Sequence, residues 1–404
     1  MKRRAFLRSV FIAGLGAHEV GIAFSRSVAT APGRIDPGLT KEWLERWEKG
    51  ILESERSRYC EHEMAEELGW LMSPFLNGFY YGYLATRDVR WIERLTDWTG
   101  AWVRRGVTEP DGYMGWPKGG TGGQQENDFY TDSLLGEAMA FRPVVLMAAE
   151  VKKDETLQKR FGKTFAGYVQ LAEKTFYKWK TRGCWREVKN GGLWVVPAFG
   201  IDQKTGRWSD GYVRREKEGF SNPANKQNHI ARWLLAMSGA TGKPVYREHA
   251  RQWFQVMQSR MRTREDGKYF VWNYWDPAGP WDLKADGTPR HWVGVHPNGG
   301  YYAIDVEGIV TAFEERLVFT QQELKKLIAT NRDFMWNQQV DHAKFQRIDG
   351  GESDPRWKDS PGLLWTALVP HDPTLREIFL KNHDPASWSG LSVTPWFLSR
   401  ERSA

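Results

Sequence analysis

The sequence reads ATRDVRW at residues 85–91 and ATGKPVY at residues 240–246. An Asp-Gly pair follows the threonine of each stretch by the same 25 residues, from 86 to 111 and from 241 to 266. Each unit therefore predicts a helix, a tight turn, a second helix and an Asp-Gly turn that opens a loop. A helical hairpin cannot bury its apolar face alone, so the repeat predicts further hairpins packed beside it.

The chain after its first residues predicts one helix after another, with weak strand signals at 192–197 and 268–274. Long stretches rich in Gly, Pro and Trp at 106–128, 185–226 and 271–300 are expected to be loops, and loops this long are usually functional. The expected helices cover residues 39–52, 61–84, 89–105, 130–151, 155–177, 227–238, 244–261, 301–319, 321–336 and 362–367. We expect an all-α fold, an (α/α) toroid of six or seven hairpins with long irregular loops, as one catalytic domain over 32–404.

The composition is that of a soluble globular protein, with 41% hydrophobic and 26% charged residues. No apolar run reaches the ~20 residues that a membrane helix needs, so no membrane insertion is expected. Some of the 22 Trp residues must fill the core, which could account for most of them, and so many also suggest a groove where rings stack on sugars. The formal net charge is +7, of which residues 1–31 supply five Lys or Arg minus Glu19, or +4. The remaining +3 is too mild for nucleic-acid binding and fits a partly basic cleft.

The N-terminus resembles a twin-arginine export signal. Lys2-Arg3-Arg4-Ala5-Phe6-Leu7-Arg8 precedes a short apolar stretch at 10–17 and a small-residue region that ends at 29–31. We expect residues 1–31 to be a signal peptide, the Tat export machinery to be a partner, and the protein to be periplasmic or secreted. Pro32 is a poor residue after a cut, so the cleavage site stays open. The sequence also leaves open whether Cys60 and Cys184 pair.

Three polar stretches suggest the family. They are ENDFYTD at 126–132, NKQNH at 225–229 and HPNGGYY at 296–302. Together with the hairpin repeat they resemble the toroid of six-hairpin glycosidases and polysaccharide lyases, over residues 40–385. The resemblance is greatest to the alginate and glucuronan lyases of polysaccharide lyase family 38. It implies β-elimination on an anionic polysaccharide that contains uronic acid.

Such a lyase needs a base for the C5 proton of the uronate and donors that stabilise the growing charge on its carboxylate. Tyr301, which follows two glycines and lies four residues before Asp305, is the expected base and acid, and Tyr302 is the alternative. His229 is expected to be the base for the opposite epimer or a group that neutralises the carboxylate. Each could instead be a packed residue.

The expected substrate-binding residues are polar or aromatic side chains near these loops. Amide and guanidinium groups would bind the carboxylate, and tryptophans would stack on sugars. Asn228 and Asn127 could instead be associated with helix caps, and the tryptophans could be core. The candidates are Asn127, Asn228, Arg290, His296, Trp116, Trp272 and Trp275.

Two other functions remain open. A glycoside hydrolase on the same toroid would need two carboxyl groups, and the candidates are Asp128, Asp132, Glu137, Asp305 and Glu307. A non-catalytic periplasmic glycan-binding protein would keep the tryptophans alone. Sequence motifs for a zinc site, a phosphate-binding loop and a nucleophilic serine are absent. The Gly-rich stretch 119–123 is not a P-loop, because it lacks the Lys that binds phosphate. We therefore expect no metal and no cofactor.

Overall fold

Two classes of helix make up the fold, and their burial separates them. In α4 (Leu134–Val151), 14 of 18 residues are buried, whereas α5 (Glu155–Thr181) buries 10 of 27. A helix that is apolar nearly all round belongs inside, and an amphipathic one covers it. The computed structural model describes residues 35–119, 129–196, 201–202, 205, 207, 219–265, 267–356, 358 and 360–403. The expected signal peptide, Asn127, Asp128 and Asp266 lie outside these residues.

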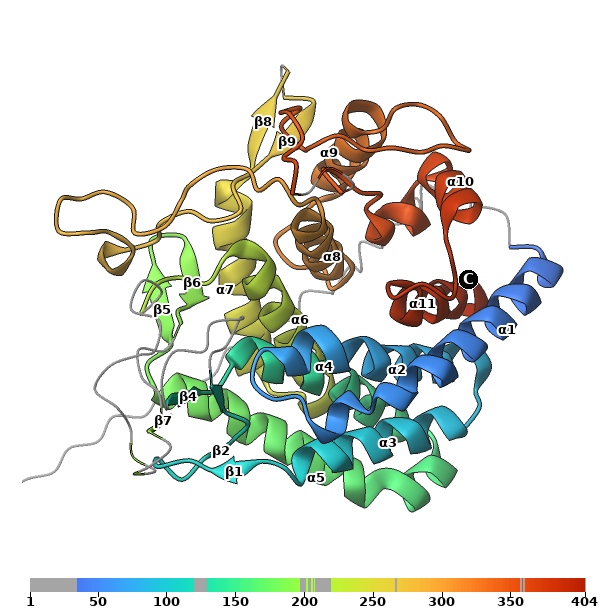
Figure 1. The fold of residues 1–404 in the computed structure, drawn as a ribbon, viewed down its shortest axis with the longest axis vertical. Helices are drawn as coiled ribbons and strands as arrows, with labels where there is room; N and C mark the ends of the chain where they lie inside the picture. The colour runs from blue at the N-terminus through green and yellow to red at the C-terminus, as the bar shows by residue number, and fades with distance from the viewer. Residues whose placement is uncertain are drawn as a thin grey trace, which may run out of the picture. The chain divides into compact units, whose positions relative to one another are not determined.

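The inner helices follow one another round a ring. Helix α2 packs on α4, α4 on α6, α6 on α8, and α8 on a 3-10 helix at Thr366–His371, while α11 packs back on α2 (Figure 1). The inner elements are α2 (Ser73–Thr86), α4, α6 (Ala224–Thr241), α8 (Gly300–Glu314), the 3-10 helix and α11 (Gly390–Ser403). The outer helices are α1 (Pro37–Ser54), α3 (Arg90–Val103), α5, α7 (Pro244–Arg260), α9 (Gln321–Ala329) and α10 (Pro373–Asn382). This is the all-α toroid that the sequence predicts.

The repeated stretch forms one turn twice, after α2 and after α6. The hydroxyl of Thr86 or Thr241 donates to the carbonyl four residues earlier, at 2.7 Å in both turns. The same oxygen accepts the amide two residues later, at 3.1 Å after Thr86 and 3.2 Å after Thr241. The residue between is left-handed in both, with φ of 63° at Arg87 and 72° at Gly242. Glycine adopts this conformation without strain, so the second turn is the more relaxed copy.

A short antiparallel hairpin follows each of three outer helices. Gly112 and Gly267, the glycines of the two Asp-Gly pairs, have φ of 83° and 87° and lie between the strands of the first and third hairpins. The hairpins are β1–β2 (Val107–Thr108, Met114–Gly115), β5–β6 (Trp185–Val188, Gly191–Trp194) and β8–β9 (Arg262–Arg264, Tyr269–Val271). A separate sheet has the order β3 (Lys118–Gly119), β4 (Phe129–Thr131), β7 (Ile201–Asp202), with both pairs antiparallel.

Several predicted boundaries differ from the structure. Helices α10 and α11 are absent from the sequence prediction, and the helix expected at 362–367 is a 3-10 helix from Thr366. The helix expected from residue 61 is delayed because Ala65 is left-handed, with φ of 52°, and its amide donates to Trp116 O at 2.7 Å. A π-helical turn at Leu68–Met72 then leads into α2.

The core accounts for most of the tryptophan. Among the residues that the structure describes, 12 Trp side chains are less than 2% exposed. Cys60 and Cys184 are both buried free thiols. None of the helices in the described part of the chain combines the length and apolarity that crossing a bilayer requires.

Candidate functional site

A cavity of about 270 Å³ lies among the inner helices. Its walls come from α2 and α11 and from residues toward the N-terminal ends of α4, α6 and α8, between one and three turns inside these last three helices. The long loops that the sequence predicts enter α4, α6 and α8 at these same ends. The polar and aromatic lining residues are Trp70, Ser73, Asn77, Tyr81, Arg142, His229, Arg232, Glu307, Thr366, Trp388, Ser389, Ser392 and Trp396.

Two arginines give the cavity an excess of positive charge. Arg142 donates from Nη1 to Asn77 Oδ1 at 3.0 Å and from Nη2 to the Tyr81 hydroxyl at 3.2 Å, so its bonds go to neutral groups. Arg232 is 5% exposed and pairs with Glu307, the one carboxylate in the lining. Burial, followed by the charge of Arg142, lowers the pKa of Arg232, although a guanidinium stays charged in proteins. The site can therefore accept an anion.

His229 lies one turn before Arg232 on α6 and lines the same cavity. Its ring meets Trp70 edge-on, with 5.7 Å between ring centroids. Its Nε2 atom is buried without a hydrogen-bond partner among the described residues. Burial, then Arg232 and then Arg142 hold the pKa of His229 well below its usual 6.5. The imidazole is therefore neutral at pH 7, and a neutral imidazole with an unoccupied nitrogen can take a proton.

Three tryptophans line the cavity, and the sequence analysis singled out none of them. Trp388 is 48% exposed, and Trp70 and Trp396 complete the group. An exposed indole can lie against the apolar face of a sugar. By contrast, Trp116 and Trp272 are 0% exposed and Trp275 is 1% exposed. A ring without exposed surface cannot stack on a sugar, so the expectation for these three is corrected: they belong to the interior.

Tyr301 lies at the start of α8, one turn before the cavity residue Ile304. Its ring stacks on Tyr274, with centroids 5.1 Å apart, and meets His296 at 4.6 Å. Tyr301 does not line the central cavity. Burial and then the charge of Glu66 raise its pKa. Glu66 connects Tyr301 to the cavity, because it also accepts a hydrogen bond from Nε1 of the lining residue Trp70 at 3.0 Å.

Three other expected residues are held by neighbours. The hydroxyl of Tyr302 accepts the His296 amide at 2.8 Å, and Tyr302 is 2% exposed, so it packs rather than faces a substrate. Arg290 donates to Trp281 O at 2.9 Å. The His296 Nδ1 atom accepts the Asn298 amide at 3.0 Å. The last two lie in the loop before α8 and outside the central cavity, and His296 is the one that contacts Tyr301.

Asn228 is a structural residue, which corrects its expected role in substrate binding. Its amide donates to Asp305 Oδ1 at 2.7 Å, its oxygen accepts Trp253 Nε1 at 2.9 Å, and it is 0% exposed. One turn before His229 the sequence offers another amide, Asn225. That side chain is 1% exposed, and neither its oxygen nor its nitrogen has a partner among the described residues. Buried polar atoms without partners are uncommon in proteins.

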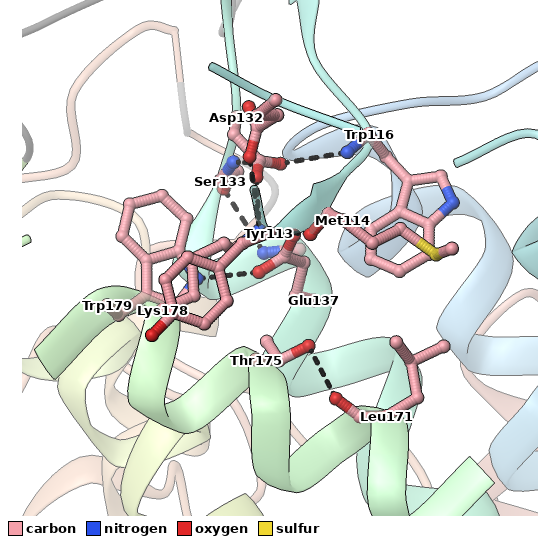
Figure 2. A network of polar contacts seen from close by, with 12 residues as sticks. Tyr113, Met114, Trp116, Asp132, Ser133, Glu137, Leu171, Thr175, Lys178 and Trp179 are labelled. Atoms are coloured by element: carbon pink, nitrogen blue, oxygen red, sulfur yellow. Dashed lines mark hydrogen bonds and ion pairs between the residues drawn. The ribbon is translucent and has the colours of Figure 1, made fainter. Parts of the chain in front are cut away.

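The acids proposed for a hydrolase lie mostly outside the cavity. Figure 2 shows Asp132 and Glu137 turned toward Lys178. Lys178 forms ion pairs with both and is fully buried. Trp179 Nε1 also donates to Glu137 at 2.6 Å. Burial and then Asp132 raise the pKa of Glu137 well above its usual value. This network joins α4 to α5 in the interior, and its acids cannot reach a sugar.

Asp305 is equally enclosed. It is 1% exposed and accepts bonds from Asn228 and from Trp272 Nε1 at 2.8 Å. Of the described hydrolase candidates, only Glu307 lines the cavity. The described residues contain no cluster of three or more His, Cys, Asp or Glu suited to a metal ion.

Comparison with known proteins supports the fold. No family model matches the sequence, and no curated protein matches it. The structure is similar to a crystal structure of a D-mannose isomerase, with a TM-score of 0.51 and 12% sequence identity, over 90% of this chain and 85% of that chain. At this identity the likeness shows the toroidal fold alone. It gives no support to polysaccharide lyase family 38 in particular.

Proposed function

We propose that this protein is a carbohydrate-active enzyme that cleaves a uronic-acid polysaccharide, of the alginate or glucuronan type, by β-elimination. The observation that carries the proposal is the grouping in one cavity of a neutral imidazole, His229, with Arg142 and Arg232. A base beside two cations suits the removal of a proton next to a carboxylate. A uronate would form ion pairs with these guanidiniums, whereas a neutral sugar could only accept hydrogen bonds from them.

The proposed reaction begins when the two guanidiniums bind the uronate carboxylate and stabilise the charge that develops on it. His229 Nε2 takes the C5 proton, the C5–H electrons form the C4–C5 double bond, and the C4–O4 bond breaks. The leaving oxygen receives a proton from a tyrosine. Tyr81 is the first candidate, because it lines the cavity and its oxygen already accepts Arg142, which leaves its own proton to donate. Tyr301 is the second.

A sugar isomerase is the second candidate function, because the toroid is similar to that of a D-mannose isomerase. Isomerisation also begins with a proton taken from carbon beside a carbonyl, which His229 could perform. The hydrolase reading is weaker, since Glu307 is the one acid in the cavity lining and is already paired with Arg232. A glycan-binding protein would not need an unpartnered base.

One set of incubations separates these functions. Alginate, glucuronan and mannose are each mixed with the protein, and ultraviolet absorbance of a new C4–C5 double bond is followed beside reducing ends and ketose. Absorbance that grows as the polymer shortens is the expected result. New reducing ends without absorbance would indicate a hydrolase, and ketose from mannose an isomerase. Binding with no product would leave a glycan-binding protein.

We also propose export through the twin-arginine route, on the strength of Lys2 to Arg8 in the sequence. Replacing both Arg3 and Arg4 by Lys should keep the precursor in the cytoplasm. Fractionation of cells with an antibody against the mature chain measures this. Equal export of the wild type and the double variant would remove the proposal.

A further inference from the structure

A second cavity continues from the central one. Its volume is about 790 Å³, and its lining residues come from α8, α10, α11 and the loop before the 3-10 helix. The central cavity of about 270 Å³ is smaller than the ~300–1,000 Å³ typical of sites for drug-sized ligands, whereas the second falls within that range. The two share Ile304, Glu307, Thr366, Ser389 and Val393 in their linings. The two cavities are therefore adjacent.

The second cavity carries two lysines at its edge. Lys344 and Lys358 both line it and both are exposed. Neither has an ion-pair partner among the described residues, unlike Lys178 in the interior. Among the described residues of the lining, the one acid is Glu307, which Arg232 already binds. The remaining charge of the second cavity is positive, and it suits further carboxylates along an acidic chain.

The rest of the lining suits sugar rings. Phe345, Leu363 and Leu364 give it an apolar wall, and Leu363 is 36% exposed. Apolar side chains pack against the C–H faces of sugars while charged groups at the edge bind the acids. His383 also lines the cavity, but its Nε2 atom is hydrogen-bonded to Thr394 Oγ1 at 2.7 Å, so it is occupied.

We infer that the substrate is a polymer whose chain runs from the central cavity into the second one, where Lys344 and Lys358 bind the carboxylates of the next sugars. This inference rests on the proposed function, because the occupant is taken to be the same acidic polysaccharide. It adds that the protein recognises several consecutive uronates rather than a single one.

The test measures how affinity depends on chain length. Calorimetry is run with mannuronate, guluronate and glucuronate oligomers of two, four and six sugars, with His229→Gln in every protein so that no oligomer is consumed. Three proteins are compared: this background, the background with Lys344→Gln and Lys358→Gln, and the background with Lys159→Gln. Lys159 is an exposed lysine on outer helix α5 that lines neither cavity. Thermal unfolding checks that all three are folded.

The background and the Lys159 control should bind the hexamer more tightly than the dimer. The double lysine variant should lose roughly 3- to 10-fold of affinity for the hexamer, as two exposed ion pairs provide, and much less for the dimer. An unchanged length dependence in the double variant would overturn the inference and leave the proposed function intact. Failure of every oligomer to bind the background and the wild type would overturn both.

Discussion

His229 offers the sharpest test of the proposed chemistry, through the substitution His229→Gln. Glutamine keeps a polar side chain of similar length but cannot take the C5 proton. A positioned base contributes ~10²–10⁴-fold to a rate, which is about 2.7–5.4 kcal/mol of transition-state free energy. We expect kcat to fall by that factor while KM changes little, because the proposed mechanism assigns carboxylate binding to Arg142 and Arg232.

The pH dependence gives a second signature of the same group. Only the neutral imidazole can act as a base, so kcat/KM should rise with pH through the pKa of His229 and then level off. Burial, Arg232 and Arg142 place that pKa well below 6.5, so the acidic limb should lie below the ordinary histidine value. In Arg232→Met the limb should move to higher pH, because a neighbouring positive charge no longer opposes protonation.

The assay is the initial rate of double-bond formation by ultraviolet absorbance across a pH series, with substrate below and above KM. His249→Gln is the matched control. His249 is 7% exposed on outer helix α7, donates from Nδ1 to Val245 O at 2.8 Å, and lines neither cavity. A His229→Gln variant within 3-fold of wild type would refute the assignment of the base. So would a wild-type acidic limb at or above pH 6.5.

Three further outcomes are expected. Arg142→Met should raise KM for acidic oligomers about 10-fold or more, as loss of a charged hydrogen-bonding group does, and leave weak binding of neutral sugars unaltered in titrations. Tyr81→Phe should lower kcat ~10²–10⁴-fold and Tyr301→Phe much less; the reverse order in steady-state kinetics would return the acid to Tyr301. Burial raises the pKa of Asp305 to about 7 from 3.8. The folded chain then binds more protons than the unfolded chain between pH 4 and 7. The free energy of unfolding in urea should therefore fall as the pH rises from 4 to 7, by at most about 4 kcal/mol, and this fall should be smaller in Asp305→Asn.

The fold could be predicted because its repeat is local chemistry. A threonine that bonds back into the helix and forward to the next turn needs no distant partner, and it occurs after both α2 and α6. The last two helices were not predicted, because their formation depends on contacts with distant parts of the chain. Helix α11 contains Pro395 and several Ser and Thr residues, which are poor helix formers, so packing against α2 determines its structure.

The site was only partly predictable. His229 was accessible to sequence reasoning because it follows a polar stretch at the start of a helix. Arg142 and Arg232 were missed, although each interrupts a strongly apolar helix, and a charge there is a signal of function. Sequence cannot separate the exposed Trp388 from the buried Trp272, because helix packing alone decides which indole reaches solvent.

The cation pair itself argues that the cavity has an anionic ligand. Burying a guanidinium is costly, and Arg142 adds to that cost by lowering the pKa of both Arg232 and His229. Well-packed apolar residues in place of buried charges are often neutral or stabilising. A single carboxylate, Glu307, whose side chain is 43% exposed, offsets only part of this. A second carboxylate from a substrate would offset the remainder, and a neutral sugar would not.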